Sequence, residues 1–243
     1  MYWAIGLGGL GAIFGSFIAT VAVRWPAPAL TGRSRCDGCG RTLAAYELVP
    51  ILSWLALRGG CRTCGGRIGL LHPVIEMIAA AIGIAAGVAA SGAPAVAGAV
   101  FGWLLLLAGA IDFVAFRLPN PVTMTIALLG LATGLAGLEP DLTDRAIGGV
   151  AGFGVLWLIS AAYVRARGRI GLGGGDAKLL GAIGLWLGWR ALPWVVLVAC
   201  MLGLGWAAAR RMRRDDRLPF GTVLGAAAFA LWLITTSNAG PIG

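Results

Sequence analysis

The sequence predicts an all-α protein that crosses a membrane several times. Of its 243 residues, 59% are hydrophobic and 12% are charged, and the mean hydropathy is +0.88. Several apolar stretches approach or exceed the roughly 20 residues that a helix needs to cross a bilayer. Forty glycines favour close packing between such helices. The fold class that follows is a polytopic helical membrane protein with about eight transmembrane helices.

The predicted spans are apolar runs separated by polar loops. They cover about 2–23, 73–91, 95–112, 120–137, 146–164, 175–189, 191–209 and 219–237. The first run lacks a preceding basic segment and an evident small-residue cleavage site, so we expect a retained helix and not a removed signal peptide. Small residues four apart, as at Gly11/Gly15 and Gly148/Gly152, are expected to pack helices of the same chain together.

The positive charge is concentrated in loops. The formal net charge is +9, and seven arginines lie between Arg24 and His72. Two shorter basic loops cover 165–169 and 210–214. With an N-terminus outside the cell, the predicted spans place all three basic regions on one side and the acidic loop 139–144 on the other. That side is expected to be the cytoplasm, since cytoplasmic loops are rich in Lys and Arg. No basic stripe interleaved with aromatic residues occurs, so we expect no nucleic-acid partner.

The longest polar segment divides the chain into three predicted parts. These are a first transmembrane helix (1–23), a cytoplasmic domain with two Cys-x-x-Cys pairs (24–72) and a seven-helix membrane domain (73–243). The pairs Cys36/Cys39 and Cys61/Cys64 are separated by 21 residues.

Four cysteines at this spacing predict a metal centre. Two tight turns can bring four thiolates to one tetrahedral zinc ion. The segment is too small to build much hydrophobic core, so a metal would supply its folding energy. The alternative is a pair of redox disulfides. The predicted cytoplasmic location weighs against it, because that compartment keeps thiols reduced.

Two aspartates occupy positions that are costly in a membrane protein. Asp112 closes the apolar run 96–111, and Asp176 opens another run, in a chain with only ten Asp and Glu. A carboxylate in or beside hydrocarbon marks a functional site by default. The predicted topology places both aspartates at the cytoplasmic side, where they can be neighbours. The alternatives are that each pairs with Arg117 or Lys178, or caps a helix.

The motifs, in their order and spacing, resemble those of one family over nearly the whole chain. The matching pieces are Gly15-Ser16-Phe17, the double Cys-x-x-Cys, 47–59, 72–76, Asp112 with Leu118-Pro119-Asn120, 173–180 and Pro219-Phe220-Gly221. Together they are similar to the prepilin peptidases, or type IV leader peptidases, which are membrane aspartyl proteases of the Gly-x-Gly-Asp class. The chain departs from the family pattern at Leu48 and His72.

The resemblance implies an aspartic-type endopeptidase of the bacterial inner membrane. It would remove the basic leader from type IV prepilins and type II secretion pseudopilins at the cytoplasmic face. It would then N-methylate the new N-terminal residue with S-adenosylmethionine as methyl donor. Asp112 and Asp176 would form the catalytic dyad. Two alternatives stay open: a peptidase without methylation, and a transporter that uses the two aspartates as a proton relay.

Further residues are expected to support these activities. Gly173 and Gly175 would let an extended substrate backbone approach Asp176. Lys178 is expected to extend toward the membrane interface. Glu76 would cap the second span or point toward the active site. The family resemblance places the methylation candidate at Glu47, for which a solvated loop acid is the alternative.

Overall fold

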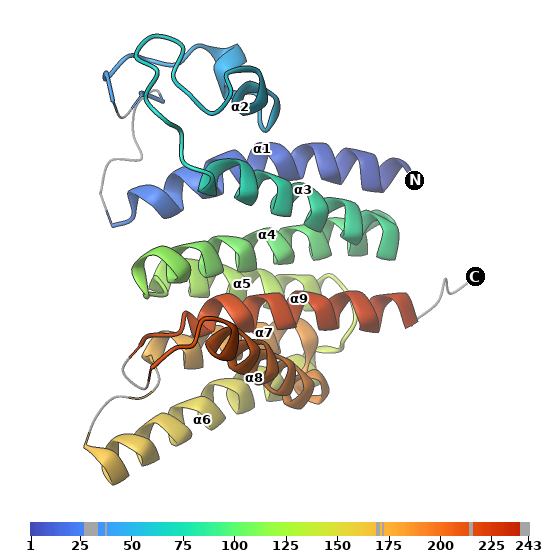
Figure 1. The fold of residues 1–243 in the computed structure, drawn as a ribbon. Helices are drawn as coiled ribbons and strands as arrows, with labels where there is room; N and C mark the ends of the chain where they lie inside the picture. The colour runs from blue at the N-terminus through green and yellow to red at the C-terminus, as the bar shows by residue number, and fades with distance from the viewer. Residues whose placement is uncertain (27–33, 37, 169–170, 172, 214–215, 239–243) are drawn as a thin grey trace. The chain divides into compact units, whose positions relative to one another are not determined.

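The computed structural model describes all residues except 27–33, 37, 169–170, 172, 214–215 and 239–243. The α-helices are α1 (Tyr2–Arg24), α2 (Leu52–Ala56), α3 (Leu71–Ala89), α4 (Gly92–Ala115), α5 (Asn120–Leu135), α6 (Leu142–Arg167), α7 (Gly174–Leu187), α8 (Leu192–Ala209) and α9 (Phe220–Asn238). Two 3₁₀ helices are η1 (Ala45–Leu48) and η2 (Trp189–Ala191). Apart from two isolated β-bridges, the described residues form no β-structure (Figure 1).

The predicted all-α membrane class is confirmed, and each predicted span coincides with a helix. Among the described residues, six helices are long and apolar enough to cross a membrane. The other two, α5 with 16 residues and α7 with 14, are shorter. At 1.5 Å per residue they extend about 24 and 21 Å, less than the hydrocarbon thickness of about 30 Å.

The chain divides into two compact units, Met1–Trp103 and Leu104–Gly243. The boundary falls inside α4. The first unit contains α1, η1, α2, α3 and the beginning of α4, and the second contains the remaining helices. This division rests on compactness alone, so the three-part division by function stays a prediction.

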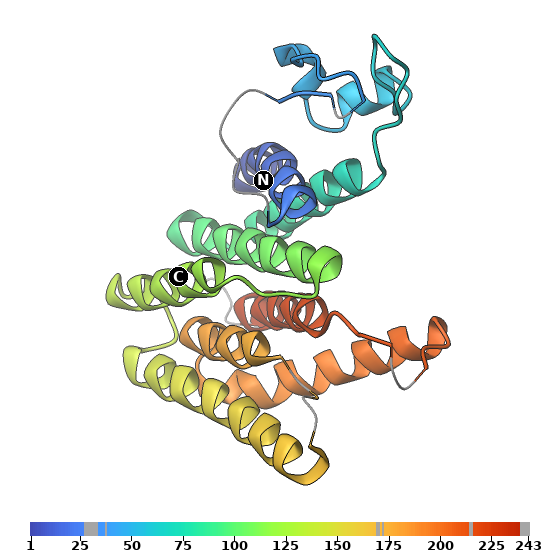
Figure 2. The ribbon, with the colours of Figure 1, turned by 90° about the vertical axis from the view of Figure 1, so that its left-hand side faces the viewer.

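In the first unit, α1 and α3 lie side by side (Figures 1 and 2). Their backbones approach closely where glycines replace side chains. A Cβ added at Gly15 would lie 2.6 Å from Cα of Glu76, and Gly11 faces the backbone of Ala79 in the same way. The indole of Trp103 donates to the Ala79 carbonyl at 2.9 Å, which brings the beginning of α4 to α3. The small-residue spacing therefore packs helices within the chain, as predicted.

In the second unit, α7 packs against α5, α6 and α9. A Cβ added at Gly152 of α6 would lie 2.7 Å from the Leu180 carbonyl oxygen of α7. Trp186 of α7 donates to the Ile126 carbonyl of α5 at 2.7 Å. Most residues of α7 are buried. A helix enclosed by protein does not need to match the bilayer thickness, which explains how α7 can be short.

A buried arginine, Arg145, holds the second unit together at one end. Arg145 is only 1% exposed. The guanidinium donates to five carbonyls and one hydroxyl: Gly130 O, Thr133 Oγ1, Leu138 O, Glu139 O, Pro140 O and Leu185 O, at 2.7–3.2 Å. One of these acceptors, the Leu185 carbonyl, lies in the last turn of α7, where carbonyls have no partner within the helix.

Replacing Arg145 with lysine is expected to destabilise the protein by about 3 kcal/mol, because one ammonium cannot serve the carbonyls that the planar guanidinium serves and each unpaired buried acceptor costs about 1–3 kcal/mol. Denaturant unfolding in detergent micelles, followed by circular dichroism, measures the effect. Arg167→Lys is the matched control, since Arg167 is exposed in the last turn of the same helix. Equal stability of the two variants would contradict the prediction.

Candidate active site and metal centre

Asp112 lies in the last turns of α4 and is 6% exposed. Its Oδ2 accepts a hydrogen bond from the backbone N–H of Thr222 at 3.2 Å. The Thr222 hydroxyl donates to the Gly109 carbonyl at 2.8 Å. Thr222 belongs to the first turn of α9, whose N–H groups have no partner within the helix. The beginning of α9 is therefore fixed against the turn of α4 that carries Asp112.

Asp176 lies in the first turn of α7 and is 7% exposed. Its backbone N–H donates to the Gly173 carbonyl at 3.1 Å. The carboxylate is close enough to Asp112 for the two to interact electrostatically. The structure therefore brings together the two aspartates that the sequence predicts as a pair.

Leu118 lies between the helix ends that surround the two carboxylates. A Cβ added at Gly175 of α7 would lie 2.8 Å from the Leu118 Cβ. One added at Gly221 of α9 would lie 2.9 Å from the Leu118 Cδ1 and 3.0 Å from the Asp112 Oδ2. The motif pieces around Leu118, Gly175 and Gly221, far apart in sequence, thus meet at the carboxylate pair.

Among the residues that the structure describes, no ion pair engages either aspartate. In the described part of the chain, the salt bridges are Arg41–Glu47 and Arg190–Asp144. The exposed Lys178 donates instead to the Asn120 side chain at 2.8 Å. Lys178 therefore links α7 to the first residue of α5 beside the carboxylate pair.

The four cysteines Cys36, Cys39, Cys61 and Cys64 converge on one point. Their Sγ atoms all lie within 4.8 Å of one another, and Cys36 Sγ is 3.7 Å from Cys64 Sγ. In a tetrahedral site with Zn–S bonds of about 2.3 Å, the sulfurs are about 3.8 Å apart. The cluster can therefore hold such an ion after a small contraction.

The two Cys-x-x-Cys turns have matching backbone hydrogen bonds. In the first turn Gly40 N donates to Cys36 O at 2.8 Å, and in the second Gly65 N donates to Cys61 O at 2.9 Å. Both glycines have a positive φ, 69° and 67°, which residues with a Cβ rarely adopt. Each turn thus presents its two thiols to the centre in the same way.

The electrostatic environment of the four thiols favours binding of a cation. The backbone N–H groups of Cys64 and Thr63 lower the pKa of the Cys61 thiol to about 6. The Gly66 N–H also favours the Cys64 thiolate, but the sulfurs of Cys61, Cys39 and Cys36 raise the pKa of Cys64 to about 11. Four thiolates this close repel one another, and a divalent cation removes that repulsion. All four cysteines are free, so the residues fit a metal ion.

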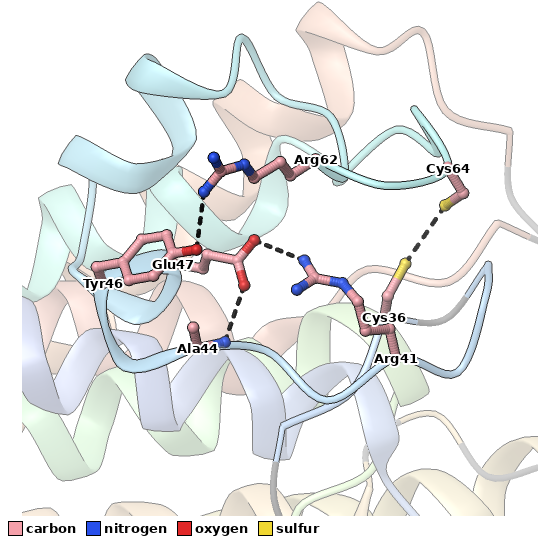
Figure 3. A network of polar contacts seen from close by, with 7 residues as sticks. All are labelled: Cys36, Arg41, Ala44, Tyr46, Glu47, Arg62 and Cys64. Carbon is pink, nitrogen blue, oxygen red and sulfur yellow. Dashed lines mark hydrogen bonds and ion pairs between the residues drawn. The ribbon is translucent and has the colours of Figure 1, made fainter.

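Glu47 lies beside this cluster, and its side chain is 2% exposed (Figure 3). Its Oε1 accepts from Arg41 Nη2 at 2.6 Å, and its Oε2 accepts from the Ala44 N–H at 2.8 Å. These two interactions, led by Arg41, lower the pKa of Glu47. The alternative of a solvated loop acid is therefore wrong, because the carboxylate is buried and paired. The pairing with Arg41 was not anticipated from the sequence.

Glu76 of α3 belongs to the first unit, whereas both aspartates belong to the second. It is 6% exposed, and its Oε2 accepts from the Ile51 N–H at 2.7 Å. Ile51 precedes α2 and has a φ of 62°, which is rare for a β-branched residue. Glu76 thus holds the residue that precedes α2, and it ties the cysteine segment, residues 34–70, to α3.

The described residues thus combine several helices of membrane-spanning length, a pair of buried carboxylates and a Cys₄ cluster that could hold a metal ion. Two family models match the chain: the bacterial peptidase A24 N-terminal domain at residues 10–90, and the type IV leader peptidase family at residues 99–208. The chain belongs to the type IV leader peptidase family, so the resemblance of the motifs is confirmed. The family and the apolar helices together indicate a multi-pass inner-membrane protein.

Several relatives carry the name prepilin leader peptidase/N-methyltransferase. The protein of Burkholderia pseudomallei strain 1026b is 43% identical over 204 residues, which are 82% of this chain and 66% of the relative. The Aeromonas hydrophila protein is 36% identical over 83% of this chain and 70% of its own length. The Pectobacterium carotovorum protein is 34% identical over 90% of this chain and 89% of its own length. No solved structure matches the chain significantly.

Proposed function

We propose that the protein is a prepilin leader peptidase that also N-methylates its product. Its substrates would be type IV prepilins and type II secretion pseudopilins, from which it removes the basic leader. The observation that carries the proposal is the pair of buried carboxylates, Asp112 and Asp176, in a chain of this family.

The carboxylate pair would act as an acid and a base. Two carboxylates in contact share one proton, because both cannot ionise cheaply. The ionised member takes a proton from a water molecule as that water attacks the scissile carbonyl. The protonated member donates its proton to the carbonyl oxygen. The C–N bond then breaks, and the leaving amine receives the proton held by the base. A hydroxyl of the tetrahedral intermediate returns its proton to the other carboxylate as the new carboxyl group forms, which restores the pair.

The glycines around the pair support binding of an extended substrate. Gly173 and Gly174 are exposed, and a Cβ at Gly173 would lie 3.1 Å from the Asp176 Oδ2. A substrate backbone can approach a carboxylate most closely where the protein carries no side chains. Lys178, held by Asn120, would support the site from the side of α5.

Gly175→Ala is expected to lower the rate of leader cleavage about 10- to 100-fold. The added Cβ would force Leu118 away from the first turn of α7, which carries Asp176. Small displacements of catalytic groups are costly to the rate. Gly205→Ala is the matched control, because Gly205 lies on α8 and nothing lies within 4 Å of a Cβ placed there. Cleavage rates of a prepilin by the two purified variants measure the difference. The prediction fails if both variants cleave equally fast.

For methyl transfer we propose S-adenosylmethionine as the donor and Glu47 as a positioning residue. When bound, this cofactor supplies the methyl group that the new N-terminal amine accepts. Glu47 supports the reaction by holding Arg41 and the Ala44 turn in place, because both of its oxygens are engaged. The four cysteines would hold a zinc ion next to that turn. This ion would be structural and would take no part in either reaction.

We further propose that the cysteine segment and both aspartates face the cytoplasm, with the N-terminus outside. The arginine-rich loops support this orientation. In intact spheroplasts, an impermeant maleimide should label a cysteine placed at Leu142, which is 40% exposed and lies within the acidic loop 139–144. It should leave a cysteine at Met212 unlabelled until the membrane is opened. The reverse pattern would invert the proposed topology.

The proposed function is tested with purified protein, a prepilin and S-adenosylmethionine in lipid vesicles, with mass spectrometry of the product. The expected product has lost its leader and carries one N-terminal methyl group. A product that has lost its leader but carries no methyl group would mean that the protein is a peptidase without methyl-transfer activity. Recovery of intact prepilin would contradict the proposal and return the proton-relay alternative.

A further inference from the structure

The cysteine segment carries exposed apolar side chains that neither the metal cluster nor the carboxylate pair uses. They are Tyr46, Leu48, Val49, Leu52 and Leu55, and each is 40–66% exposed. We call these five residues the η1–α2 surface. They fall within ten consecutive positions of η1, α2 and the turn between them. So many large, exposed apolar side chains within one short segment indicate an interaction surface.

The fold directs this surface outward. Between its members, Glu47 turns inward to Arg41, and the Ile51 N–H turns inward to Glu76. The half-buried Trp54 donates to the Ile68 carbonyl at 3.4 Å. The polar groups of the run are thus satisfied inside the first unit, and the large apolar side chains remain outside.

The surface lies level with the ends of membrane-spanning helices. Both ends of the cysteine segment continue into such helices, α1 and α3. Glu76, which binds Ile51, lies five residues after Leu71, about 8 Å along the α3 axis. In Figures 1 and 2 the segment lies beside the α1–α3 pair and does not extend the pair along the helix axes. In a bilayer that α3 crosses from its first turn, a group at this level lies near the boundary between lipid headgroups and acyl chains.

Charge complements the apolar surface. Arg58, Arg62 and Arg67 are exposed in the same segment. Arg62 donates to the Tyr46 hydroxyl at 2.8 Å, so one arginine directly borders the η1–α2 surface. Among the residues from 34 to 70 that the structure describes, Glu47 is the one acidic residue, and it is buried against Arg41. Apolar side chains bordered by exposed arginines are typical of segments that lie in an anionic lipid interface.

We propose that the η1–α2 surface is an interfacial membrane anchor. Its apolar side chains enter the acyl-chain boundary, and the neighbouring arginines contact anionic lipid headgroups. The anchor fixes the cysteine segment at the membrane surface independently of substrate. This role goes beyond the proposed function, and its test does not depend on activity.

Photolabelling of the full-length protein in nanodiscs tests the proposal. The bilayer contains phosphatidylglycerol and a phosphatidylcholine whose acyl chain carries a diazirine. Trypsin releases residues 42–58, which contain the whole η1–α2 surface, and residues 63–67, which are a polar part of the same segment. We expect several-fold more label on 42–58 than on 63–67. Equal labelling would overturn the proposal.

Variants then assign the label to the surface. The double change Leu52→Glu and Leu55→Glu should reduce labelling several-fold with the metal content unchanged, whereas Leu52→Met and Leu55→Met should keep it. Unchanged labelling of the glutamate variant overturns the proposal. If the labelling of 42–58 is the same in bilayers with and without phosphatidylglycerol, the proposed contacts between the arginines and anionic headgroups are wrong. If a prepilin with a photoreactive apolar segment labels 42–58 and the lipid does not, the surface binds substrate and the anchor is wrong.

Discussion

Asp112→Asn and Asp176→Asn should each reduce the rate of leader cleavage by about 10³-fold or more. Asparagine keeps the size of the side chain but cannot take up or release the proton. Acid–base catalysis by positioned groups contributes about 10²–10⁴-fold to the rate. The two losses should not add, because the carboxylates act as one unit. Cleavage of a co-expressed prepilin, followed on a gel for each single and the double variant, measures this.

The control separates chemistry from folding. Asp216→Asn changes an exposed aspartate whose carboxylate accepts from the Arg213 N–H at 2.7 Å, so cleavage should continue. All variants must insert in the membrane at wild-type levels. Cleavage near the wild-type rate by either Asp112→Asn or Asp176→Asn would rule out the dyad and favour the transporter alternative.

The sequence predicted the carboxylate pair because its signal is local. A charged residue at the end of an apolar run is visible without knowledge of the fold, and so is the spacing of four cysteines. The span count was also local, since each helix follows an apolar run. The short length of α7 was visible too, since the predicted span 175–189 is close to the observed 14 residues. Its burial among α5, α6 and α9 was not predictable in this way, because it is a tertiary property.

The polar contacts that organise the two units were missed for the same reason. Glu76 meets Ile51 across 25 residues, and Arg145 meets Leu185 across 40. The sequence placed Arg145 at the edge of a span, where an arginine normally reaches solvent. Such long-range pairs leave no periodic pattern. These polar contacts at helix ends add to the glycine and tryptophan contacts along the helix faces.

Removing the metal centre should have the second large effect. Cys61→Ser deletes the most buried of the four thiols, which is 7% exposed. We expect the metal content to fall from about one ion per chain to near zero, since three remaining thiolates do not complete a closed tetrahedral site. A structural zinc ion contributes about 10–16 kcal/mol in small domains, so the segment 34–70 should become sensitive to protease.

Cys200→Ser is the matched control, because Cys200 is an exposed, free cysteine on α8 outside the cluster. It should keep the metal and resist protease like the wild type. Metal analysis and limited proteolysis of both variants decide the matter. A Cys61→Ser variant that retains its metal, or a wild-type protein without any, would rule out the proposed centre.

The two activities should respond differently to this loss. Glu47 and its Arg41 contact lie beside the cysteines in the first unit, whereas Asp112 and Asp176 belong to the second. Methylation by Cys61→Ser should therefore fall at least about tenfold more than leader cleavage, because an unfolded segment cannot position Glu47. Equal losses would mean that the cysteine segment also positions the substrate for cleavage, and that the metal organises both reactions.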